Sequence, residues 1–293
     1  MLNQSAVEYL MTYGWSILIV AVILGALAYL GAFNPLYFAP KANPGSCQVF
    51  RPNGAGTSYD INLLGVCNGE IPEYTGDFDG IGSVFSGPGS YVNVINSNSL
   101  NVKYITMAAW INLPSYNCGS DRGIIFNKEN SYEWGIRCNS GNLDAAISPN
   151  WAWYGTYQQI PLNKWTFVAV TWNGVSQNYY IDGEESISYT LTPGQIQSSS
   201  GCLRIGARWC PSPPGSFFLG QMSNVQIYNT SLDQNSIIAL YQEGIGGAPI
   251  DLQNLVGWWP LNGDANDYSG NGNNGVPTNV VYTSSWISGY NPP

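Results

Sequence analysis

The chain has 293 residues, of which 9% are charged and 14% are aromatic, and it contains 34 glycines. This composition fits strands and turns better than a helical bundle, and the length fits an apolar helix with one large or two small domains. The net charge of −9 argues against a nucleic-acid partner, and the absence of histidine excludes imidazole bases and imidazole metal ligands.

Residues 4–34 form an apolar stretch that carries one formal charge, on Glu8. A bilayer-spanning helix needs about 20 apolar residues, so we expect one long helix here, ended by Pro35. Small residues recur along it at helical steps and favour close packing between neighbouring helices. They are Ala21, Gly25, Ala28 and Ala32. A simple membrane anchor is the alternative.

The segment QSAVEYLMTYGW, followed by the apolar helix, resembles the N-terminus of archaeal type IV pilins. The resemblance implies cleavage between Asn3 and Gln4, which leaves residues 1–3 as a leader remnant. It also implies that Glu8 pairs with the new amino group of Gln4 during filament assembly. The leader lacks the basic residues that such leaders usually carry. Cleavage by a signal peptidase at the Ala26-Leu27-Ala28 triplet is an alternative.

Six cysteines form an even set in a chain with export features, so we expect disulfides. Sequence alone leaves their connectivity open, and we favour sequential pairing because each pair would close a local loop. The predicted pairs are Cys47–Cys67, Cys118–Cys138 and Cys202–Cys210. The first would staple a hairpin within residues 35–76, a region that otherwise has the composition of a hinge.

From residue 77 onward, short runs of β-branched and aromatic residues alternate with turn-forming clusters, and these runs predict strands. The runs are SYVNVI, ITMAAWINL, GIIFN, YEWGIRC, LDAAIS, WTFVAVTW, QNYYIDG, CLRIGA and NVQIYN. One helix is expected from Ser231, its N-cap, to Gly244. Many strands with one late helix favour a β-sandwich.

Segments such as FDGIGSVFSGPGSYVNV, KWTFVAVTWNG and GQMSNVQIYNTSL resemble the laminin-G-like, concanavalin A-like jellyroll family. In that family a segment similar to GWWPLNGDANDYSGNGNNG opens the domain, whereas here it comes last. The resemblance implies a mainly β head over residues 77–293, circularly permuted and completed by strands from residues 255–293. A fragment of a second repeat is the alternative.

The loop DANDYSGNGNNG is dense in the oxygen ligands that calcium prefers. Asp264, Asp267 and Asn271 are the candidate ligands, and the family resemblance points first to Asp267. Ser223 and Asn224 stand where the family usually has an acidic pair, which weakens the case. Asx-rich turns without a metal are the alternative.

Exposed aromatic residues commonly form the floor of a sugar site. The densest cluster is WAWYGTY, in an expected loop after LDAAIS, and its candidate carbohydrate-binding residues are Trp151, Trp153 and Tyr154. The alternative, which we favour at this point, is that the two Trp rings face the core or a neighbouring subunit. Arg208-Trp209 is a weaker second candidate.

We expect no catalytic site. Glycosidases of this architecture use two carboxylates across a cleft, and no closely spaced acidic run on one strand is present. Glu129 and Glu133 are expected to bracket a turn as exposed charges. Asn229, in the sequon Asn229-Thr230-Ser231, is a candidate glycosylation site.

The expected function is that of a subunit of an archaeal type IV pilus-like filament at the cell surface. The helices would form its core, and the heads would form its exterior and serve adhesion. Its partners would be copies of itself, the membrane before assembly, and cell-surface glycans. The alternatives are a single-pass surface protein with a carbohydrate-binding head and a secreted hydrolase.

Overall fold

The structure, a computed structural model, describes residues 18–25, 74–79 and 89–283 and divides into two units, residues 1–41 and 42–293. In the first unit, residues 18–25 are α-helical, and their large apolar side chains are all exposed. The remainder of the helix predicted over residues 4–34 lies outside the described residues. Within the described part of the chain, no helix has both the length and the hydropathy needed to cross a membrane.

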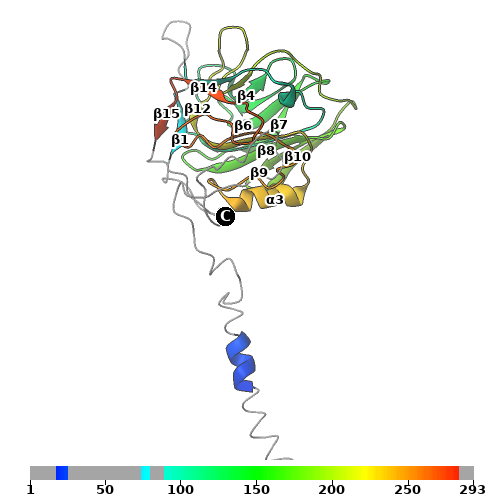
Figure 1. Ribbon diagram of the computed structural model, residues 1–293, viewed down its shortest axis with the longest axis vertical. Coiled ribbons are helices and arrows are strands. Elements are labelled where there is room, and N and C mark those ends of the chain that lie inside the picture. The colour runs from blue at the N-terminus through cyan, green and yellow to red at the C-terminus, as the bar shows by residue number, and fades with distance from the viewer. Residues whose placement is uncertain (1–17, 26–73, 80–88, 284–293) are drawn as a thin grey trace, which may run out of the picture. The chain divides into compact units, whose positions relative to one another are not determined.

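The second unit is a sandwich of two antiparallel sheets, as Figure 1 shows. The eight-stranded sheet has the order β10-β9-β8-β3-β12-β1-β15, with β13 paired to β12. Its strands are β1 (Thr75–Asp79), β3 (Ile105–Asn112), β8 (Thr166–Trp172), β9 (Ser176–Ile181), β10 (Glu184–Thr190), β12 (Leu219–Tyr228), β13 (Leu255–Trp259) and β15 (Val281–Thr283). The mainly β sandwich predicted from the strand pattern is confirmed.

The seven-stranded sheet has the order β14-β2-β11-β4-β5-β6-β7. Its strands are β2 (Tyr91–Val94), β4 (Arg122–Lys128), β5 (Tyr132–Arg137), β6 (Asn142–Ile147), β7 (Trp153–Gln159), β11 (Leu203–Ile205) and β14 (Gly275–Thr278). A short 3₁₀ helix, η1 (Asn98–Leu100), follows β2. The expectation that WAWYGTY is a loop is wrong, because most of it forms the edge strand β7.

Alternation along each strand places one set of side chains between the sheets. On β5, Tyr132, Trp134 and Ile136 join this core, so the residues between them, Glu133 and Gly135, face outward from the seven-stranded sheet. The same rule applies to the neighbouring strands and fixes which side chains gather on the outer face.

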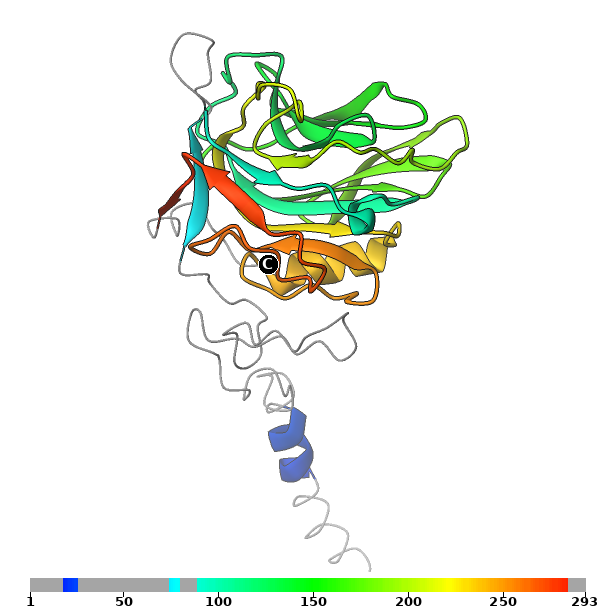
Figure 2. The same ribbon diagram turned by 45° about the horizontal axis from the view of Figure 1, so that its top comes forward.

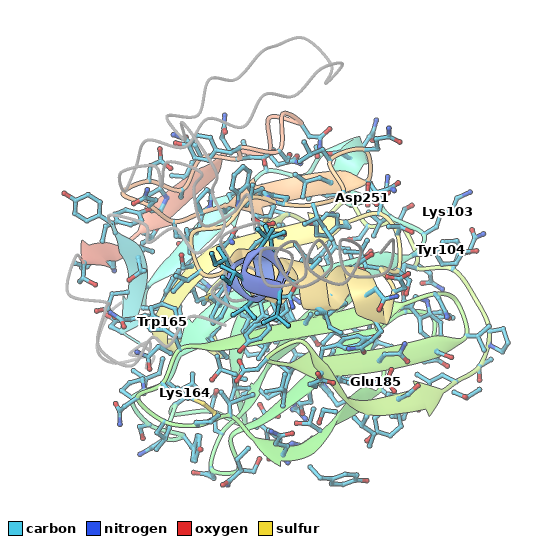
Figure 3. The ribbon with its side chains drawn as sticks, turned by 90° about the horizontal axis from the view of Figure 1, so that it is seen from below. Lys103, Tyr104, Lys164, Trp165, Glu185 and Asp251 are labelled. Carbon is cyan, nitrogen blue, oxygen red and sulfur yellow. A yellow bond between two sulfur atoms is a disulfide. The ribbon has the colours of Figure 1, made fainter. Side chains whose placement is uncertain are left out.

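Helix α3 (Gln234–Glu243) covers the outer face of the eight-stranded sheet (Figure 1), and Figure 3 views the molecule from this side. Ile237 and Leu240 of the helix are buried in a second apolar layer. The N-cap is Asp233, whose side chain accepts a hydrogen bond from the Ser236 amide, and not Ser231 as predicted. Gly244 ends the helix with φ of 83°, a conformation that suits glycine.

The C-terminal strands complete both sheets. β13 pairs with β12, β14 pairs with β2, and β15 pairs with β1, so the red strands in Figure 2 lie beside the cyan strands. Trp259 and Leu261 are buried between the sheets. The alternative of a second-repeat fragment without a partner sheet is therefore wrong, while circular permutation relative to the family stays a prediction.

Candidate functional site

The outer face of the seven-stranded sheet carries an unusual set of charged residues, which we call the charged face. It comprises Arg122, Glu133, Arg137, Asp144, Arg204 and Arg208, together with the ring of Trp153. Four of the five arginines in the chain lie here, although the protein as a whole is acidic. Positive charge is therefore concentrated on this one face of the folded head.

Glu133 lies at the centre of this face and is 0% exposed. Arg208 donates to both of its carboxylate oxygens, at 2.8 Å and 2.6 Å, and the Asn127 amide donates to Oε2 at 2.8 Å. Burial raises the pKa of Glu133, and the Arg208 guanidinium opposes that shift. Asn127 also accepts a hydrogen bond from the Trp209 amide, so this buried network holds the segment that carries Trp209.

Asp144 is the second buried carboxylate of the charged face and is 1% exposed. Its Oδ2 accepts from Arg122 Nε at 3.0 Å and from Arg137 Nη2 at 2.9 Å. Its Oδ1 has no hydrogen-bond partner among the described residues. Burial raises the pKa of Asp144, and both guanidinium groups oppose the shift. The charge on these groups is balanced locally, which is how a sheet face tolerates buried ions.

Tryptophan side chains lie over these charges. Arg122 lies 3.9 Å from the ring centroid of Trp153, and Arg208 lies 5.6 Å from it. Arg208 is also 5.8 Å from the ring of Trp209. Such distances permit cation–π attraction, which orients the rings. Trp209 is 43% exposed, so aromatic surface remains open at this face. Trp151, which comes two residues before Trp153, is 38% exposed.

The backbone at these two exposed tryptophans is uncommon. Trp151 has φ of 40° and Trp209 has φ of 65°, and they are the only aromatic residues with positive φ in the described ranges. A bulky side chain in the left-handed region is unfavourable, and such outliers concentrate at ligand sites. An added Cβ at Gly215 would lie 2.4 Å from the Trp209 ring, so glycine there gives the ring its space.

Two disulfides frame the charged face, and both were predicted. Cys118–Cys138 joins the loop before β4 to the end of β5, and Cys202–Cys210 joins β11 to the loop that carries Trp209. The predicted pair Cys47–Cys67 lies outside the described residues. The confirmed pairs hold the loops at the two sides of the face.

The structure separates the three predicted carbohydrate-binding residues. Trp151 and Trp153 are partly exposed, so the interpretation that places them in the core is wrong. Tyr154 points the other way along β7 and packs against Tyr189 and the core, with ring centroids 5.1 Å apart. The residue that joins Trp153 on the charged face is Trp209, the weaker of the two sequence candidates.

The predicted calcium loop is closed by its own hydrogen bonds. Asp267 is buried, and its carboxylate accepts from the amides of Trp258, Ser269 and Asn273 and from the Ser269 hydroxyl. These donors occupy all four acceptor positions of the carboxylate. Asn271 turns its amide nitrogen toward the carbonyls of residues 255 and 256. This arrangement does not fit calcium at Asp267, and it favours the alternative of an Asx-rich turn.

Asp264, the third predicted calcium ligand, accepts hydrogen bonds from the Asn266 side chain and the Tyr268 hydroxyl. Within the described residues no cluster of three or more His, Cys, Asp or Glu side chains could hold a metal ion. Calcium binding by Asp264 and the other oxygens of this loop stays a prediction from sequence.

Some of the other predicted residues lie within the described ranges, and the rest lie outside them. Asn229, the candidate glycosylation site, is exposed. Ala21 and Gly25 lie in the helical segment of residues 18–25, and a Cβ added at Gly25 would meet no atom within 4 Å. The remaining assembly and processing residues lie outside the described residues. They are Asn3, Gln4, Glu8, Ala28 and Ala32.

Sequence reasoning missed the charged face. The prediction that Glu133 is an exposed charge beside a turn is wrong, because it lies within β5 and is fully buried. A signal was present: in YEWGIRC the polar residues alternate with Tyr132, Trp134 and Ile136, which places them together on the opposite face. The partners on other strands carry no comparable signal, because strand order is not visible in one sequence.

The chain is similar to solved structures of low sequence identity, and the first of them shares the fold of the head. A candidate carbohydrate-binding protein from Bacteroides ovatus is 19% identical, with a TM-score of 0.56, over 73% of this chain and 61% of that one. The chain thus spans less than two thirds of that protein. A pentraxin from Limulus polyphemus is 13% identical, with a TM-score of 0.47, over 72% of this chain and 94% of that one.

Domain 4 of an extracellular arabinanase from Geobacillus stearothermophilus, solved with arabinotriose, is 19% identical, with a TM-score of 0.43. The match covers 67% of this chain and 86% of that one. No curated protein matches the sequence. A family model described as the concanavalin A-like lectin/glucanases superfamily matches residues 85–238, which is more than half of the 293 residues. The chain therefore belongs to the concanavalin A-like lectin/glucanase superfamily.

Proposed function

We propose that the head is a glycan-binding module at the cell surface and that the charged face is its binding surface. The observation that carries this proposal is the grouping of Trp153 and Trp209 around Arg208, with Trp209 43% exposed. An indole ring stacks on the apolar face of a sugar, while guanidinium groups donate hydrogen bonds to its oxygens. The Bacteroides ovatus protein of the same fold is described as a candidate carbohydrate-binding protein.

The charged face would bind without catalysing hydrolysis. Glycosidases need one carboxyl group free to give a proton and another free to act as base or nucleophile. Here Arg208 and Asn127 hold both oxygens of Glu133, and two guanidinium groups hold Asp144. Because both carboxylates are held in ion pairs, their role would be to support the side chains that position the tryptophans.

The test is binding of the full chain, in detergent, to an array of immobilised glycans, followed by titration with the best-bound oligosaccharide. Trp209→Ala should weaken binding about tenfold, the equivalent of losing one stacking contact. The matched control is Tyr104→Ala, because Tyr104 is an exposed aromatic residue directly before β3, a strand of the other sheet. Equal affinity of the wild type and Trp209→Ala would contradict the proposed surface.

A second candidate function is that of a subunit of a type IV pilus-like filament, which fits the same head on its exterior. The observation that favours it is the helical segment of residues 18–25, in which every large apolar side chain is between 48% and 62% exposed. Apolar side chains of this number are costly in water and call for a partner. In a filament that partner is the same segment of other copies.

The rival for this segment is a single-pass membrane anchor, for which the partner is lipid. Electron microscopy of native cell surfaces and N-terminal sequencing of the exported protein separate the two. A filament subunit should begin at Gln4 and polymerise, because the resemblance to archaeal pilins implies cleavage after Asn3. A monomer that keeps Met1 and remains in the membrane would contradict the filament.

A further inference from the structure

We infer that Arg204 is a positioning residue for Trp209. The Trp209 loop, residues 206–218, joins β11 to β12, and Arg204 lies on β11 two residues before it. This role rests on the proposed function, in which the Trp209 ring contacts the glycan, and it explains how the ring is held before the glycan arrives. A side chain that is fixed in advance loses less freedom on binding, which favours affinity.

The Trp209 loop lies over the outer face of the seven-stranded sheet. Strand register places Asn93, Arg204 and Asn127 in one row across β2, β11 and β4. Cys210 Sγ lies 3.4 Å from Asn93 Oδ1, and the Trp209 amide donates to Asn127 Oδ1 at 3.2 Å. Arg204, between these two contacts, is only 6% exposed. The row therefore lies beneath the loop, with Arg204 in its middle.

All the hydrogen bonds that Arg204 makes to described residues go to this loop. Its Nη1 donates to the carbonyl oxygens of Arg208 at 3.4 Å and Ser212 at 2.9 Å, and to that of Trp209. Within the described part of the chain no carboxylate forms an ion pair with Arg204, whereas the other arginines of the charged face each have one. A buried charge is unfavourable without polar partners, so the loop carbonyls are what stabilise this guanidinium.

The guanidinium is itself held in orientation. Its central carbon lies 5.1 Å from the centroid of the Tyr91 ring on β2. Burial lowers the pKa of Arg204, while Tyr91 and Glu129 oppose that shift. Arginine stays protonated in proteins, so the group remains a cation that attracts carbonyl oxygens. The loop thus meets a donor whose position is set by the sheet.

The bonded carbonyls determine the backbone conformation of Trp209. The carbonyls of Arg208 and Trp209 belong to the two peptide groups on either side of the Trp209 Cα. Because a peptide group is planar, fixing both groups fixes φ and ψ of Trp209. Its φ is 65°, in the left-handed region, which a bulky residue keeps only where its surroundings hold it. Arg204 supplies that constraint and so sets the direction of the ring.

The Cys202–Cys210 disulfide constrains the same segment in a different way. It joins residues that are 8 positions apart and limits the distance between them. A fixed distance between two ends does not specify how the peptide groups between them are turned. Loss of the Arg204 side chain should therefore displace the Trp209 ring even though the disulfide remains.

Nuclear magnetic resonance of the full chain in detergent tests the positioning without a glycan. The indole N–H signal of Trp209 is identified by its loss in Trp209→Ala. In Arg204→Met this signal should shift or broaden, because the ring is no longer held in one direction. The matched control Lys164→Met removes one positive charge from the segment before β8, on the other sheet, and should leave the signal unchanged.

Glycan titration then tests the consequence for binding. Arg204→Met should bind the best-bound oligosaccharide about tenfold more weakly, as expected for Trp209→Ala. The double variant Arg204→Met/Trp209→Ala should be no weaker than Trp209→Ala alone, because Arg204 then has no ring to position. A residue that merely stabilises the fold would add its own loss in the double variant. Lys164→Met should bind like the wild type.

The outcomes separate this inference from the proposed function. Unchanged binding in Trp209→Ala contradicts the proposed function, and the indole signal still tests the positioning. Weakened binding in Trp209→Ala, together with an unchanged signal and affinity in Arg204→Met, overturns the role of Arg204 alone. Additive losses in the double variant also overturn it. Should Arg204→Met fail to fold, Arg204→Lys replaces it, because an ammonium group keeps the charge but lacks the planar fork of donors and should shift the same signal.

Discussion

The outer faces of the two sheets differ in how their side chains are protected from unfavourable exposure to water. On the eight-stranded sheet, Trp110 and Phe167 lie under Tyr241 of α3, with ring centroids 5.7 Å and 6.1 Å apart. On the seven-stranded sheet, paired charges and partly exposed tryptophans take the place of the apolar layer, and no helix of the described part covers them. An apolar outer face needs a cover, whereas a face of mutually neutralised ions can remain open to a ligand.

The largest effect should come from breaking the charged face at its centre. Glu133→Ala leaves Arg208 and Asn127 without their buried acceptor, and removing one partner of a buried ion pair costs about 4 kcal/mol. Chemical denaturation measures this loss. Glu184→Gln, at an exposed position on β10, is the control and should change stability little. A loss below about 1 kcal/mol in Glu133→Ala would mean that the pair is not buried as described.

The helix-covered face should respond to loss of apolar volume. Ile237→Ala opens a cavity between α3 and the sheet and should lower the free energy of unfolding by about 3 kcal/mol. Ile238→Ala, at a half-buried position on the same helix, should cost less. Glycan binding should be unchanged in both variants, since α3 lies on the other side of the sandwich from Trp209. Weakened binding at equal stability would contradict this division of roles.

A smaller effect on stability is expected from the loop between β13 and β14, which joins the two sheets. Asp267 accepts from the amides of Trp258 on β13 and Asn273 before β14, so Asp267→Asn should destabilise the head by about 2 kcal/mol. The same measurement with added calcium and with a chelator tests the sequence-based calcium site. The hydrogen-bonded loop predicts equal thermal midpoints, whereas a higher midpoint with calcium would support a metal at Asp264 and Asp267.

The smallest effect is expected from Lys128. Its side chain can lose its proton at alkaline pH, whereas the arginines of the charged face stay protonated. Burial lowers the pKa of Lys128 to about 8, and its Nζ donates to Asn96 and to the carbonyls of Ser199 and Gly201. Below pH 8 the lysine is charged in both states. Between about pH 8 and 10 the unfolded state binds more protons than the folded state, so the free energy of unfolding should rise as the pH increases.

Chemical denaturation at about pH 7.5 and about pH 10 would detect this rise. Lys128→Met should abolish the pH dependence in this window while it lowers stability at both values, because three acceptors lose their donor. A fall in stability between the two pH values in the wild type would contradict a lowered pKa for Lys128.

Sequence patterns predicted most of the strands, because alternation of buried and outward side chains is a local property of each strand. ITMAAWINL became β3 and WTFVAVTW became β8, both in the core. The prediction of a loop at WAWYGTY was wrong because the segment forms the edge strand β7. This strand is only partly buried, so buried and exposed side chains alternate weakly along it. The Cys118–Cys138 and Cys202–Cys210 pairs were predictable because each closes a short segment.

The candidate sites were less accessible to sequence reasoning. Trp153 was predictable as an aromatic residue beside other aromatics, but its partner Trp209 lies 56 positions away, as their numbers show. Glu133 and Arg208 are likewise distant in sequence and meet only through the pairing of β5 with β4 and of β4 with β11.

The amino-acid sequence by itself determined the β character of the head, its acidic charge and the apolar nature of its first residues, and it favoured the two disulfides that the structure describes. These follow from composition and from patterns with short periods. Only the tertiary structure decided that four arginines share one sheet face, that Glu133 is buried, and that the C-terminal strands close both sheets. The physical reason is that strand pairing joins residues far apart in the chain, and the energy of a buried ion pair exists only once both partners have been brought together.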